Sequence, residues 1–205
     1  DKHSSIKALA YQLYENNGVL KRENVSEYLK NLGQNERKTL RDLGVKFGRY
    51  HIFLYKLIKP EPVVLRTLLW KNYHQKYLKL TPPTFGLNFI EDKDNRNKNF
   101  MLLCGFEKFD NYFVRIDILE RLFMQIINSG SDEIKEIKLV PEMLNLLGCS
   151  KDNFKKLIKK MNYKVTKKDD NLFFRYIPQK RSKKVFDKKI KKETPFEVLK
   201  NLNLG

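Results

Sequence analysis

The chain has 205 residues, 41% hydrophobic and 32% charged, a balance that excludes a wholly disordered protein. Lysine and arginine outnumber aspartate and glutamate by 42 to 24, which gives a net charge of +18. Because so large an excess repels itself, a polyanionic partner is expected, and nucleic acid and an anionic membrane surface both qualify. No run of about 18 apolar residues occurs, which excludes a membrane-spanning helix.

The start of the chain and its cysteines indicate the compartment. The sequence begins at Asp1 without a methionine or a signal-peptide pattern, so we expect a piece of a longer, cytoplasmic protein with no membrane partner. Cys104 and Cys149 have no CxxC spacing, and we expect two buried, reduced thiols.

Residues 1–79 are predicted to form a helical domain. Ile6, Leu9 and Leu13 recur at helical spacing before the breaker Asn-Asn-Gly, and similar stripes follow. The run VKFGRYHIFLYKLI, residues 45–58, fits either a strand or a helix and stays undecided.

Residues 80–99, LTPPTFGLNFIEDKDNRNKN, contain two prolines, a glycine and a polar run, and are predicted to be a linker loop. The segments FMLLCGF and YFVRI that follow are predicted to be short strands or extended segments. Apolar residues between 119 and 127 then predict a helix, followed by the short extended piece IKLV.

Start and stop residues delimit the next elements. Pro141 opens a helix through Leu147, Gly148 is placed to end it, and Ser150 is placed to cap the next helix. The segments YKVT and LFFRY alternate as a two-stranded hairpin.

This order of elements is typical of a winged helix-turn-helix domain. The predicted fold class is therefore mainly α (α+β), with an N-terminal helical domain, a winged helix-turn-helix-like domain over 100–177 and a basic flexible tail over 178–205. The last residues of the tail, PFEVLKNL, predict a short terminal helix that folds back or binds a protein partner.

Most of the positive charge lies in one part of the chain. Residues 151–192 hold 17 basic and 4 acidic side chains, a net charge of +13, whereas the rest of the chain carries only +5. In the stretch GCSKDNFKKLIKKMNYKV, Phe154, Leu157 and Ile158 share a buried face, and lysines crowd the opposite side. Lysine is a flexible point charge, so we expect phosphate contact without strong sequence preference rather than base reading.

The predicted interface combines this helix with the hairpin and the tail. Its nucleic-acid-binding residues are Lys151, Lys155, Lys156, Lys159, Lys160, Lys167, Lys168, Arg175, Lys180, Arg181, Lys183 and Lys184. We expect these cations to face one shared polyanion. Phe173, Phe174 and Tyr176 on the hairpin are candidates for stacking on bases, although most of them are expected in the core.

The sequence contains no motif for catalysis. The phosphate-binding loop GxxxxGK[ST], GxGxxG and HExxH are all missing, and no nucleophile has an evident base. His51 lies in an apolar run and is expected to be a packed, hydrogen-bonded ring. We therefore expect no enzyme activity, metal or cofactor in this chain.

Several stretches, above all GVKFGRYHIFL and LLGCSKDNF, resemble the region that follows the helicase core in alphaproteobacterial relatives of the mitochondrial degradosome RNA helicase. The resemblance covers most of residues 6–163 and the end of the chain. It implies an ATP-dependent parent helicase acting on RNA or DNA, whose ATP and magnesium sites lie in an upstream core. That core is then a partner of this region.

The expected function is thus a C-terminal nucleic-acid-binding region that grips the phosphate backbone for an attached motor. The alternative is a protein-docking winged-helix module of a larger nucleoprotein assembly, which a large exposed apolar patch would favour. The sequence leaves RNA and DNA undistinguished.

Overall fold

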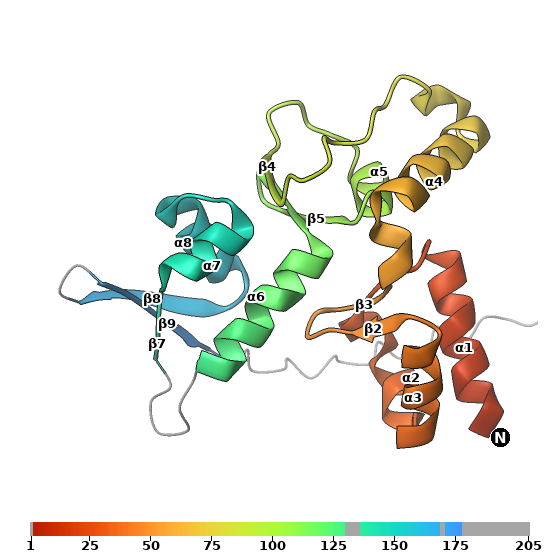
Figure 1. The fold of residues 1–205 in the computed structure, drawn as a ribbon, viewed down its shortest axis with the longest axis horizontal. Helices are drawn as coiled ribbons and strands as arrows, with labels where there is room; N and C mark the ends of the chain where they lie inside the picture. Colours follow the sequence, from red (N-terminus) through yellow and green to blue (C-terminus); the bar gives the residue numbers. More distant parts are fainter. Residues whose placement is uncertain (1, 130–135, 169–170, 178–205) are drawn as a thin grey trace, which may run out of the picture.

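The computed structural model of the chain describes residues 2–129, 136–168 and 171–177 (Figure 1). Helices pack around three small antiparallel sheets, which we name sheet A (strand order β1-β3-β2), sheet B (β4-β6-β5) and sheet C (β7-β9-β8). The predicted basic tail, residues 178–205, lies outside the described part of the chain.

The predicted fold class is wrong. The structure is 53% helical and 21% strand, so it is mixed α/β rather than mainly α with a winged helix-turn-helix domain. The N-terminal half, predicted to be a helical domain, contains all of sheet A. Strands of three or four residues are too short to leave a clear alternation of apolar and polar residues, which is why helical stripes dominated the prediction.

The N-terminal part is built on sheet A. Its elements are α1 (Lys2–Glu15), β1 (Val19–Lys21), η1 (Arg22–Val25), α2 (Ser26–Asn31), α3 (Gln34–Asp42), β2 (Val45–Phe47), β3 (His51–Leu54) and η2 (Tyr55–Ile58). Leu9 and Leu13 of α1 pack with Ile52 of β3 in its core. The undecided run is therefore a β2–β3 hairpin followed by a 3-10 turn.

Sheet B follows a long helix. The elements are α4 (Pro60–Tyr73), η3 (Gln75–Tyr77), β4 (Phe89–Glu91), α5 (Lys98–Leu103), β5 (Phe106–Phe109) and β6 (Tyr112–Arg115). The predicted linker over 80–99 thus contains β4, which pairs with β6. The start of FMLLCGF is helical rather than extended, because the Asn97 side chain accepts a hydrogen bond from the Phe100 backbone N–H and caps α5.

Helix α6 (Ile116–Ser129) joins all three sheets and lies between sheets A and C (Figure 1). Ile116 packs with Phe53 of sheet A, whereas Leu122, Phe123 and Ile126 belong to the core beneath sheet C. A helix buried on so much of its surface fixes the N-terminal part relative to the C-terminal part.

The C-terminal part consists of β7 (Ile137–Lys138), α7 (Pro141–Leu147), α8 (Lys151–Lys160), β8 (Tyr163–Lys168) and β9 (Asn171–Tyr176). Gly148 ends α7 in the left-handed conformation at φ 67°, and its N–H donates to the Leu144 carbonyl at 2.8 Å. The Ser150 hydroxyl accepts from the Asn153 N–H at 3.3 Å and caps α8. Both predicted helix boundaries are confirmed.

Candidate nucleic-acid interface

Helix α8 presents its lysines to solvent because its other face is buried. Phe154, Leu157 and Ile158 are at most 2% exposed and pack in the core shared with sheet C. The five lysines predicted on this helix occupy the remaining surface, and none of them is buried. They form two rows, one of which faces sheet B.

The first row consists of Lys151, Lys155 and Lys159, which lie four residues apart on one flank of α8. Lys155 Nζ lies 3.0 Å from an oxygen of Asp152, a side chain that is 81% exposed. The hydrogen bond from Lys155 lowers the pKa of the Asp152 carboxyl. Such an exposed pair contributes little stability, so a phosphate can replace the carboxylate at small cost.

The second row consists of Lys156 and Lys160 and faces the β5–β6 turn. Lys156 Nζ donates to the Tyr112 hydroxyl at 3.3 Å, and Lys160 Nζ lies 3.4 Å from an oxygen of Asp110. Asp110 and Lys160 are both more than half exposed. The contacts place this row beside sheet B but leave its ammonium groups accessible to a ligand.

The hairpin cations divide between two faces of sheet C. Phe174 is buried and pairs with Val165, so Lys167, two residues along β8 from Val165, lies on the inner face of the sheet. Lys168 and Arg175 lie on the outer face. Figure 1 shows α7 and α8 on one side of this hairpin.

The expectation of one shared cationic surface is therefore wrong. The helices cover the inner face of sheet C, so the α8 lysines and the outer-face cations, Lys168 and Arg175, point to different sides. The other four predicted residues, Lys180, Arg181, Lys183 and Lys184, lie outside the described residues.

Two further cations lie on the outer face and were missed. Lys164 is paired with Arg175 across β8 and β9, and Lys138 is paired with Phe173 across β7 and β9. Lys164 and Lys168 are an even number of positions apart, which places both on one face of a strand, so the sequence did indicate Lys164. Nothing in the sequence indicated that Lys138, far away along the chain, completes the same surface.

A buried acid–histidine network (His51, Glu107 and Glu120) joins sheets A and B through α6. His51 Nδ1 lies 3.1 Å from Glu120, and His51 Nε2 lies 3.4 Å from Glu107, which also pairs with Lys21 at 2.9 Å. The expectation that His51 is a packed, hydrogen-bonded ring is confirmed. Burial alone lowers the pKa of His51, but the hydrogen bonds to both carboxylates outweigh burial and raise it.

Glu120 also fixes the β2–β3 turn. Its carboxylate accepts hydrogen bonds from the backbone N–H groups of Arg49, Tyr50 and His51. A Cβ at Gly48 would lie only 2.3 Å from the Glu120 carboxyl carbon, so only glycine permits this approach. The network therefore holds α6 and sheet B against sheet A.

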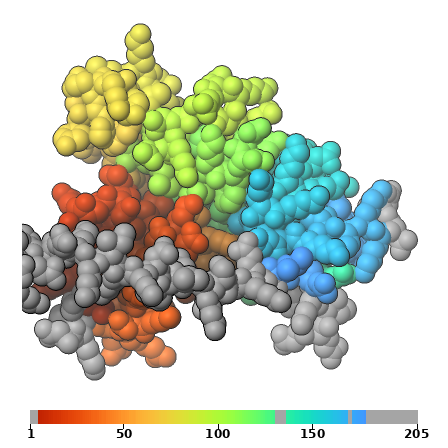
Figure 2. Space-filling model, turned by 180° about the vertical axis from the view of Figure 1, so that it is seen from behind, coloured from red at the N-terminus to blue at the C-terminus, as the bar shows by residue number. Residues whose placement is uncertain are grey.

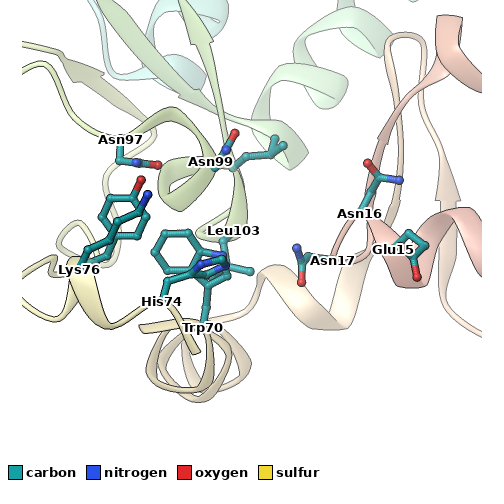
Figure 3. A pocket seen from close by; sticks show the side chains of 11 residues that line it. Glu15, Asn16, Asn17, Trp70, His74, Lys76, Asn97, Asn99 and Leu103 are labelled. Carbon is teal, nitrogen blue, oxygen red and sulfur yellow. The ribbon is translucent and has the colours of Figure 1, made fainter. Parts of the chain in front are cut away.

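A hollow of about 420 Å³ beside Trp70 lies apart from the cationic surfaces (Figure 3). The rings of Trp70 and Tyr77 stack with centroids 5.0 Å apart, and the His74 ring lies 4.6 Å from Trp70. Asn16 and Asn17, at the end of α1, line the opposite side. Since none of the predicted cations lines this hollow, we do not place the interface there.

Within residues 2–129, 136–168 and 171–177, no group of three or more His, Cys, Asp or Glu side chains is arranged to hold a metal ion. In the same ranges, no helix combines the length and the apolar character needed to cross a bilayer.

No protein-family model and no curated protein matches the chain. Its function must therefore be argued from its own residues.

Proposed function

We propose that this chain is a non-catalytic nucleic-acid-binding region that grips the phosphate backbone without strong sequence preference. The main support for this proposal comes from helix α8, whose apolar residues lie in the core while its five lysines remain accessible to solvent. Among the residues that the structure describes, Lys151 and Lys159 have no acidic partner. A helix whose charges served stability alone would alternate lysine with glutamate.

The residue types on α8 favour backbone contact over base reading. Lysine offers a point charge, whereas readout of a base edge needs two hydrogen bonds from arginine, asparagine or glutamine. Asn153 is the one amide on this helix, and its side chain already accepts a hydrogen bond from the Tyr112 hydroxyl at 3.0 Å. We therefore expect similar affinities for oligonucleotides of different sequence.

The resemblance to the region that follows the helicase core supports a role for this binding surface next to a helicase motor. In that arrangement ATP and magnesium bind the upstream helicase core, in the cytoplasm, and this chain holds the strand that the motor moves. The two sources of support are independent, because the positions of the lysines do not depend on the resemblance.

The test is charge reversal on the first row of α8. The triple variant Lys151→Glu, Lys155→Glu and Lys159→Glu should bind a labelled oligonucleotide more weakly than the wild-type chain. The slope of log affinity against log salt should also become shallower by about 2, since each phosphate contact contributes roughly 0.7 for a single strand. Fluorescence anisotropy at several salt concentrations measures both quantities.

A matched control removes the same charge elsewhere. Lys7, Lys30 and Lys38 are exposed on α1, α2 and α3, at the opposite end of the molecule from α8 (Figure 1). Their triple glutamate variant should retain the wild-type salt slope. Equal losses in the two variants would show that only net charge matters and that α8 is not the contact.

A second candidate function, protein docking, is favoured by the exposed apolar face of α4. Its apolar side chains are between 50% and 84% exposed: Val64, Leu65, Leu68, Leu69 and Tyr73. This helix projects at the end of the molecule opposite to α8, as Figure 2 shows in yellow, so both functions are compatible. Leu65→Lys with Leu69→Lys should preserve oligonucleotide affinity and abolish capture of the helicase core supplied as a separate polypeptide.

A further inference from the structure

The outer face of sheet C carries an aromatic ring surrounded by cations. Phe173, in the central strand β9, pairs with Lys138 on one side and Thr166 on the other. In the next row of the same face Lys164 pairs with Arg175. The adjacent Phe174 is 1% exposed and points into the core, so the two phenylalanines have different roles.

The charge on this outer face is strongly positive. Lys138, Lys164 and Arg175 are exposed, as is Lys168 at the end of β8. Among the described residues, Glu136 beside β7 is the acid that these cations meet, and the hydrogen bond from Lys168 together with the charges of Arg175 and Lys164 lowers its pKa.

Phe173 is half-buried, and the side chain over its ring is a displaceable lysine. The Lys168 ammonium lies 5.7 Å from the centroid of the Phe173 ring and 2.6 Å from an oxygen of Glu136. Lys168 therefore crosses the ring to reach its partner. The Lys168–Glu136 pair lies at the surface, where such pairs contribute little stability, so a planar base can take the place of Lys168 over the ring.

We propose that the outer face of sheet C binds an unpaired nucleic-acid strand, with one base stacked on Phe173 and the neighbouring phosphates held by Lys138, Lys164 and Arg175. Lys168 leaves the ring when the base arrives and contributes to phosphate binding. This inference rests on the proposed function and adds the substrate class, because bases inside a duplex are already stacked and cannot cover Phe173. Any base has a π-face, so the surface is sequence-tolerant.

The test compares the full chain with Phe173→Leu and Phe173→Trp. The probes are a 12-nucleotide oligo(U) RNA, a 12-nucleotide oligo(dT) DNA and a 12-base-pair duplex, measured by fluorescence anisotropy. Leucine keeps an apolar side chain but removes the ring, so affinity for the single strands should fall roughly 5- to 150-fold, the equivalent of one stacked base. Tryptophan should retain or improve affinity.

Two further readouts separate stacking from charge. Phe173→Leu should leave duplex affinity and the salt slope unchanged, because it removes no cation. The pair Lys164→Gln and Arg175→Gln, which leaves the ring in place, should make the single-strand slope shallower by about 1.4. This second variant does not depend on whether position 173 tolerates leucine.

The outcomes distinguish this inference from the proposed function. Salt-dependent binding by the wild type with undiminished single-strand affinity in Phe173→Leu overturns the stacking site alone. A wild-type chain that binds none of the three probes overturns the proposed function as well. Tighter binding of oligo(U) and oligo(dT) than of the duplex, lost in Phe173→Leu, supports the stacking site, since both single strands present unpaired bases.

Discussion

Replacing Glu120 by glutamine should destabilise the fold far more than an ordinary surface substitution. The Glu120 carboxylate accepts three backbone hydrogen bonds from residues 49–51 and a fourth contact from the His51 ring. Glutamine keeps one acceptor oxygen and turns an amide NH₂ toward backbone donors. At least one buried N–H then loses its partner, and His51 loses a charged neighbour.

The expected cost is about 3–5 kcal/mol, the usual range for breaking a buried charged pair by removing one partner. For a chain of this size each kcal/mol lowers the melting temperature by about 2–4 °C, which gives a shift of roughly 6–20 °C. Thermal unfolding followed by circular dichroism measures the shift. Glu142→Gln, at an exposed position of α7, is the matched control and should stay within about 0.5 kcal/mol of wild type. A Glu120→Gln protein as stable as this control would refute the structural role of the network.

Three further predictions concern stability and thiol chemistry. The pKa of His51 is raised above its ordinary 6.5 in the folded chain, so its stabilising contribution is complete below pH 6.5 and is lost as pH rises through the folded value. Urea unfolding should show this alkaline loss in the wild type and not in His51→Gln; parallel curves would contradict it. Gly148→Ala should cost about 1–2 kcal/mol because of the positive φ alone, since nothing lies within 4 Å of the added Cβ. Gly148→Asn should cost less, because asparagine tolerates the left-handed conformation; similar losses in the two variants would disprove the backbone explanation. Cys104 is buried in the core of sheet B and Cys149 is half-buried against the core beneath sheet C. Burial raises the thiol pKa of Cys104 to about 12 and of Cys149 to about 11, so both should react slowly with a disulfide reagent at pH 8 until urea is added, and rapid labelling of the folded chain would contradict this burial.

Local signals were the most dependable part of the sequence. The end of α7 at Gly148 and the cap of α8 at Ser150 each depend on one side chain or one backbone angle, so a few neighbouring residues suffice to predict them. The amphipathic face of α8, with Phe154 and Leu157 in the core, followed from periodicity alone.

Sheets A and B were harder to predict from the sequence, because pairing between strands distant in the chain determines whether these segments are extended. β4 consists of only Phe89–Glu91 within a polar, proline-containing segment, and it is a strand because β6 lies beside it. In FMLL, Phe100, Met101 and Leu103 are buried and Leu102 is half-buried, and four consecutive apolar residues have no period by which a helix differs from a strand.

In the candidate site too, local features could be predicted from the sequence, whereas features that depend on strand pairing could not. Periodicity placed the lysines of α8 correctly on its exposed side. The side of the hairpin that faces solvent depends on which residue of β9 enters the core, and burial of Phe174 sends Lys168 and Arg175 away from α8. Lys138 joins that surface only through the pairing of β7 with β9, a contact between segments far apart in the chain.

The salt dependence of binding by the unmodified chain tests the central claim most directly. Log affinity for a labelled single-stranded oligonucleotide should fall linearly with log salt concentration, with a slope of about −2 or steeper, as expected when at least three cations replace counterions on phosphate. The slope should be the same for oligonucleotides of unrelated sequence. Binding that is undetectable at low salt, or that does not change between low and high salt, would contradict the proposal.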